Sequence, residues 1–127
     1  ETKFITVVQN VKVNRIKKDN KILLDYKPYK FISIRIYNKK LEIDAPNHEL
    51  IKYFEIKEKN KIVIDYKVSN DFFTKTKKIK HPKILKIAIG DHPAKNFFRV
   101  VITMRSKLSK DNKITYENKL LLIDNLY

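Results

Sequence analysis

The residues most able to carry chemistry lie between Lys83 and Met104, in the stretch KILKIAIGDHPAKNFFRVVITM. This stretch contains Gly90, the only glycine of the chain, then the loop DHPAKN, and then Arg99 within an apolar run. We expect two strands here, with Gly90 at the end of the first. A charge set among apolar neighbours either pairs with an opposite charge or anchors a ligand. Both roles stay open for Arg99, and an acid on a neighbouring strand, such as Asp65, is its best structural partner.

No set of residues has the spacing of a catalytic or metal site. The three histidines, His48, His81 and His92, form no metal-binding spacing such as HxxxH. His81 and His92 each precede a proline, and the extended backbone before proline explains both pairs. With one glycine and no cysteine, the chain lacks a glycine-rich phosphate loop, a nucleophile elbow and a thiolate. The sequence therefore predicts a protein that is not an enzyme and that uses no metal and no cofactor.

The chain is strongly basic, with 29 Lys and Arg residues, 14 Asp and Glu residues and a formal net charge of +15. Such a field attracts polyanions, among them nucleic acid, anionic lipid and acidic cell-wall polymers. Only four basic residues are arginines. Because arginine is the side chain that grips phosphate bidentately, this usage disfavours nucleic acid. Lysines and tyrosines on a surface could bind sugars or anions. The alternative interpretation is that the lysines reflect a compositional bias and that the tyrosines pack in the core.

Hydrophobic residues alternate with polar ones along several segments, which is typical of strands with one buried face. Examples are residues 32–36, 41–45 and 62–66. Three segments, 16–22, 56–62 and 108–114, share a polar stretch that ends in Asn-Lys between aliphatic residues. Asparagine tolerates a positive φ, so these segments predict hairpin turns. We favour a strand from about residue 50 and interpret residues 71–78 as a connection. No apolar run approaches the roughly 18 residues of a membrane-spanning helix.

These features predict an all-β fold, a two-sheet β-sandwich built from successive antiparallel hairpins, with residues 1–127 as a single domain. Three motifs then resemble the AMIN domain family: NKIVIDY at residues 60–66, ILKIAIG at 84–90 and FRVVI at 98–102. The resemblance covers about residues 31–126. Residues 4–27 precede it, as an extra or a diverged N-terminal hairpin.

The resemblance implies a non-catalytic periplasmic module that positions a larger envelope protein, as AMIN domains do on cell-wall amidases and secretins. The expected partner is peptidoglycan or another anionic envelope component. One alternative is a protein–protein interaction module of an envelope machine, such as a secretin or flagellar-motor scaffold. A nucleic-acid-binding β-domain is a third, supported by charge alone. Since the chain begins at Glu1, we expect a processed piece whose signal peptide has been removed or lies outside it. The candidate ligand-binding residues are Arg99, Arg35, Lys86, Tyr66, Asp65, Asp91, His92 and Lys95.

Overall fold

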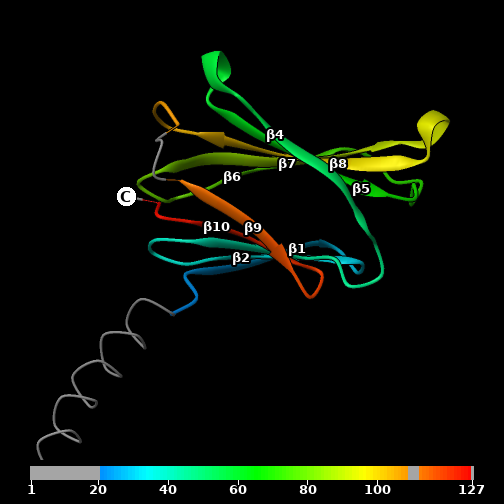
Figure 1. The fold of residues 1–127 in the computed structure, drawn as a ribbon, viewed down its shortest axis with the longest axis horizontal. Helices are drawn as coiled ribbons and strands as arrows, with labels where there is room; N and C mark the ends of the chain where they lie inside the picture. The colour runs from blue at the N-terminus through cyan, green and yellow to red at the C-terminus, as the bar shows by residue number, and fades with distance from the viewer. Residues whose placement is uncertain (1–20, 109–111, 127) are drawn as a thin grey trace, which may run out of the picture.

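The computed structural model describes residues 21–108 and 112–126. Two five-stranded antiparallel sheets pack face to face, one above the other in Figure 1. The lower layer, sheet A, has the strand order β1-β2-β3-β10-β9, and the upper layer, sheet B, has the order β4-β5-β8-β7-β6. The described residues include no α-helix. The prediction of an all-β sandwich is confirmed.

Ten strands lie within the part of the chain that the structure describes. Sheet A contains β1 (Leu24–Tyr29), β2 (Ile32–Ile36), β3 (Leu41–Asp44), β9 (Lys113–Glu117) and β10 (Leu120–Asp124). Sheet B contains β4 (Leu50–Ile56), β5 (Lys61–Lys67), β6 (Lys75–Lys78), β7 (Ile84–His92) and β8 (Phe97–Met104). Of the predicted N-terminal hairpin, residues 4–20 lie outside the described residues. The end of that segment belongs to β1, which pairs with β2 at the edge of sheet A.

The predicted alternation places one face of each strand in the core. On β2, Ile32, Ile34 and Ile36 are buried, while the residues between them face outward. Isoleucine suits this position because its branched side chain packs well on a pleated surface. The two inner faces together form one hydrophobic cluster between the sheets.

Asparagine supplies the left-handed turn conformation that glycine usually supplies. Asn60 (φ 54°) ends the short 3₁₀ turn Lys57–Lys59 between β4 and β5, as predicted from the Asn-Lys pattern. Asn96 (φ 57°) does the same after Pro93–Lys95, between β7 and β8. At the β9–β10 hairpin both central residues, Asn118 and Lys119, have positive φ, which gives the turn the twist that neighbouring strands need.

Two expectations about local structure were wrong. The second half of residues 71–78 is the edge strand β6, not a connection. It lacks the alternation of apolar residues because its inward-facing residues are lysines. Lys75 Nζ lies 4.2 Å from the ring centre of Tyr29, and Lys77 Nζ lies 5.7 Å from that of Tyr26, so β6 closes the sandwich against β1 by cation–π contacts. Gly90 lies inside β7 and does not end it.

His81 connects the two sheets. Its Nε2 lies 3.0 Å from each of the carbonyl oxygens of Tyr37 and Asn38 in the β2–β3 turn, and its Nδ1 accepts a hydrogen bond from the backbone N–H of Lys83 at 3.0 Å. These contacts define the neutral tautomer with hydrogen on Nε2. Arg105 donates to the His81 carbonyl at 2.7 Å and thereby fixes the same loop. This buried histidine therefore has a structural function.

His48 is also buried and fully paired. Its Nδ1 donates to the Lys67 carbonyl at 2.8 Å, and its Nε2 lies 3.3 Å from the amide nitrogen of Asn70, which donates to it. The ring packs at right angles on Phe98, with 5.0 Å between ring centres. His48 thus anchors the β3–β4 connection to sheet B.

Candidate functional site: the outer face of sheet B

Asp65 on β5 and Arg99 on β8 are directly opposite each other on the outer face of sheet B. Arg99 Nε donates to Asp65 Oδ1 at 2.7 Å, and Arg99 Nη2 donates to Oδ2 at 3.0 Å. The Asp65 side chain is only 3% exposed, whereas 33% of the Arg99 side chain remains accessible. These hydrogen bonds raise the pKa of the Arg99 guanidinium above its usual value. The predicted pairing of Arg99 with Asp65 is confirmed.

Aromatic rings hold the Arg99 guanidinium from two sides. Its Cζ lies 5.7 Å from the ring centre of Phe54 and 5.6 Å from that of Phe97. The two hydrogen bonds to Asp65 use two of the five guanidinium N–H groups, and the other three have no protein partner among the described residues. Arg99 is therefore a fixed donor that remains able to bind a carboxylate or carbonyl oxygen of a ligand.

Two neighbours shape the surface beside Arg99: Gly90 on β7 and Phe97 on β8. Gly90 lies opposite Arg99 on β7, and a Cβ added there would meet only Thr74 Oγ1, at 3.4 Å. The glycine is therefore not required by its backbone angles, but it leaves one side of Arg99 uncovered. The ring of His92 stacks on Phe97, with 4.6 Å between ring centres and an interplanar angle of 8°. His92 thus extends the aromatic surface that Phe97 forms beside Arg99.

Other predicted site residues lie apart from Arg99. Tyr66 is 0% exposed and faces the core, stacked on Phe98, so a ligand on the outer face does not reach it. Arg35 lies on the outer face of sheet A, on the opposite side of the sandwich, where Glu42 and Asp44 each lie 3.5 Å from its Nη2. The structure thus separates these two residues from the Arg99 site.

Asp91 stabilises the connection between β5 and β6. Its carboxylate accepts hydrogen bonds from Ser69 Oγ at 2.6 Å and from the backbone N–H of Asn70 at 3.3 Å. Burial alone would raise the pKa of Asp91, but these hydrogen bonds, with further ones from the backbone, outweigh burial and lower it.

The two predicted lysines lie at different places. Lys95 is exposed in the turn between β7 and β8. Lys86 lies on the outer face of sheet B with Arg99, four residue pairs further along β7 and β8.

Sequence reasoning missed Phe54 as part of the site. The position of Phe97 beside Arg99 could be predicted, since the two residues are two apart on the same strand and therefore share a face. Phe54 lies on β4, and its proximity to Arg99 depends on the order β4-β5-β8. No local signal in the sequence identifies that order.

The described residues contain no group of three or more His, Cys, Asp or Glu side chains that could hold a metal ion. A hollow of about 660 Å³ lies elsewhere, at the β1–β2 turn, and includes Tyr29, Phe31 and Arg35 in its wall. Within residues 21–108 and 112–126, no helix is long and apolar enough to cross a membrane. The Arg99 site itself is an open sheet face, a shape that suits a polymer or a protein better than a small molecule.

The described residues thus form a two-sheet β-sandwich with the Asp65–Arg99 pair on an outer face. Residues 32–124 match the AMIN domain, and the chain belongs to that family, as its motifs predicted. The match begins with β2 and ends with β10, so β1 is outside it. AMIN domains are periplasmic modules that localise proteins in the cell envelope and are non-catalytic. Searches of curated proteins and of solved structures gave no match.

Proposed function

We propose that this chain is a non-catalytic, periplasmic localisation module that binds peptidoglycan through the outer face of sheet B. Its family membership supports the envelope role. The observation that carries the proposal is Arg99, whose guanidinium is fixed by Asp65 and keeps three N–H groups for a ligand. A donor that is already held in one rotamer loses little conformational entropy on binding.

The chemistry of the face matches the two components of peptidoglycan. The stem peptides carry carboxylates, which the free edge of Arg99 can bind with charge-assisted hydrogen bonds. The glycan strands present sugar rings, whose apolar faces can pack on the Phe97 and His92 rings beside Arg99. Lys52, which is opposite Asp65 on the edge strand β4, adds an exposed positive charge to the same row of the sheet.

Co-sedimentation with purified sacculi tests this proposal. At about 100 mM salt, where long-range attraction between exposed charges is screened, we expect the wild-type chain to bind and Arg99→Gln to bind at least tenfold more weakly. Arg35→Gln is the matched control, because it removes the same charge from the other sheet face. Its affinity should stay within twofold of the wild type.

Loss of Arg99 leaves the Asp65 carboxylate without its partner, so folding needs its own control. The double variant Asp65→Asn/Arg99→Gln removes both charges and should retain a cooperative unfolding transition. If the wild type does not co-sediment, or if a folded Arg99 variant binds sacculi as well as Arg35→Gln does, the proposal is wrong.

A second candidate function is protein–protein interaction within an envelope machine, and the edge strand β4 favours it. Ile51 and Tyr53 on β4 are 46% and 41% exposed, and an uncovered edge strand can accept a strand from a partner. This function predicts that Tyr53→Lys keeps its affinity for sacculi but no longer localises in the envelope of living cells. Unchanged localisation of this variant would argue against it.

A further inference from the structure

Lys78 and Lys86 are directly opposite each other on β6 and β7, on the outer face of sheet B. Like charges at directly opposed positions destabilise a strand pair. No carboxylate compensates for them: the ion pairs among the described residues involve Lys27, Lys67, Arg35 and Arg99, and neither Lys78 nor Lys86. The surrounding sequence, residues 72–90, contains six lysines and no acidic residue.

The same row of sheet B contains a third lysine. Lys86 is opposite Thr103 on β8, and Thr103 is opposite Lys61 on β5. Since adjacent strands are about 4.8 Å apart, the backbone positions of Lys78, Lys86 and Lys61 span roughly 15 Å across the sheet. We call these three residues the lysine row. In the next outward-facing row toward Arg99, the residues on β7, β8 and β5 are Ala88, Val101 and Val63, which are short and apolar.

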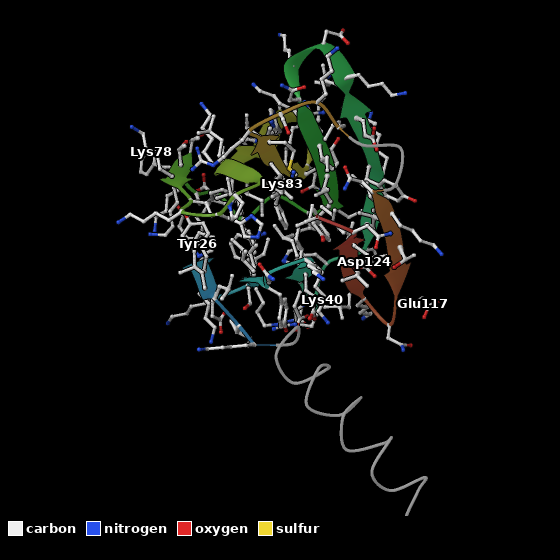
Figure 2. All side chains as sticks on the ribbon, turned by 90° about the vertical axis from the view of Figure 1, so that its left-hand side faces the viewer. Tyr26, Lys40, Lys78, Lys83, Glu117 and Asp124 are labelled. Carbon is white, nitrogen blue, oxygen red and sulfur yellow. The ribbon has the colours of Figure 1, made fainter. Side chains whose placement is uncertain are left out.

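Protection of the sheet edge explains only part of this row. Lysine on an edge strand prevents pairing with another chain, and Lys78 is on the edge strand β6. Lys86 and Lys61, however, lie on β7 and β5, which have neighbouring strands on both sides. Figure 2 shows Lys78 at one edge of the sandwich, while Glu117 and Asp124 lie toward the other. Protection of the edge therefore accounts for Lys78 but not for Lys86 and Lys61.

We propose that the lysine row binds consecutive phosphate groups of a linear phosphate-bearing polymer that crosses the strands of sheet B. Lysine binds phosphate as a compact point charge. One phosphate between Lys78 and Lys86 removes their mutual repulsion, and the next phosphates along the polymer lie toward Lys61. An acidic peptide added as a strand would run along β6 and, of the three residues of the lysine row, would contact only Lys78. This site goes beyond the proposed function, because it uses other residues and another ligand chemistry.

Binding of the full chain to linear polyphosphate, measured by isothermal titration calorimetry, tests the lysine row. Lys61→Gln/Lys78→Gln/Lys86→Gln should bind at least tenfold more weakly than the wild type at about 100 mM salt, with a shallower dependence of affinity on salt. The matched control is Lys30→Gln/Lys113→Gln/Lys119→Gln, which removes three exposed lysines elsewhere. Its affinity should fall less than threefold. The lysine-row variant should be at least as stable to urea as the wild type, because it removes like-charge repulsion.

Three results would overturn the proposal. The first is absence of polyphosphate binding by the wild type; binding to vesicles of anionic phospholipid in that case would indicate a membrane surface instead. The second is an equal loss in both triple variants, which would reflect net charge alone. The third is a loss in Lys78→Gln as large as in the triple variant, which would indicate an acidic strand on β6. Arg99→Gln should bind polyphosphate as the wild type does, so failure of this site and failure of the sacculus site are distinguishable.

Discussion

Asp65 and Arg99 are 34 residues apart in the chain, yet β5 and β8 place them directly opposite each other, joined by two hydrogen bonds of 2.7 and 3.0 Å. The carboxylate is buried and the guanidinium is one-third exposed. Asp65 therefore fixes the geometry of the pair, and Arg99 is the partner that a ligand can reach.

Breaking this pair from one side should destabilise the fold more than removing it altogether. We expect Arg99→Gln to lower the free energy of unfolding by about 1–3 kcal/mol, since a buried carboxylate loses its partner. The further change Asp65→Asn should restore part of that loss. Urea unfolding of both single variants and the double variant gives the coupling energy. Simple additivity of the two changes would show that the pair contributes nothing to stability.

Tyr66→Phe should stabilise the protein or leave its stability unchanged. The Tyr66 hydroxyl is buried and has no hydrogen-bond partner in the part of the chain that the structure describes. Removing an unpaired buried hydroxyl is expected to gain up to about 1 kcal/mol, and the stacking of the ring on Phe98 is retained. A loss of more than about 1 kcal/mol in thermal or urea unfolding would show that the hydroxyl does have a partner.

The same variant should change the stability of the fold at alkaline pH. Burial raises the pKa of the Tyr66 phenol, with smaller contributions from Tyr116 and Asp44. Because the folded pKa exceeds the unfolded value of about 10, the contribution of this group is complete below pH 10 and is lost as the pH rises further. Tyr66→Phe should therefore lose less stability than the wild type between pH 9 and pH 11, as measured by urea unfolding.

Asp91 should make the fold sensitive to acid. Its pKa is lowered in the folded state, so its contribution to stability is present above the unfolded value of about 3.9 and is lost as the pH falls below it. Asp91→Asn should be less stable than the wild type at pH 7 and should show a smaller further loss between pH 5 and pH 3. Equal acid dependence of both proteins would contradict this role.

His81→Ala should weaken the junction between the sheets. The substitution removes the hydrogen bonds to the β2–β3 turn and leaves the partly buried N–H of Lys83 without its acceptor. We expect a loss of about 2–3 kcal/mol in urea unfolding, because a hydrogen-bonded group is deleted and a donor is left unpaired. His92→Ala is the matched control, since the exposed side chain of His92 stacks on Phe97 and its loss should stay below about 1 kcal/mol.

The sequence by itself determined most of the described strands, the turn at Asn60 and the family. Period-two alternation is a local property of each segment, so Ile32, Ile34 and Ile36 identified a buried face before any partner strand was known. Asn60 identified its turn because few residues other than glycine accept a positive φ. The three aliphatic motifs identified the AMIN domain because each is a contiguous run and can be read from the sequence without knowing its partner strands.

The order and register of the strands, and therefore the candidate site, were decided only in the tertiary structure. Phe54 approaches Arg99 because β4 joins the sheet next to β5, and Lys78 faces Lys86 because of the β6–β7 register. A shift of one residue would have sent Arg99 into the core and Tyr66 to the surface, since adjacent residues of a strand point to opposite faces. The burial of both inner faces selects among such registers, and that burial is a property of the two sheets together.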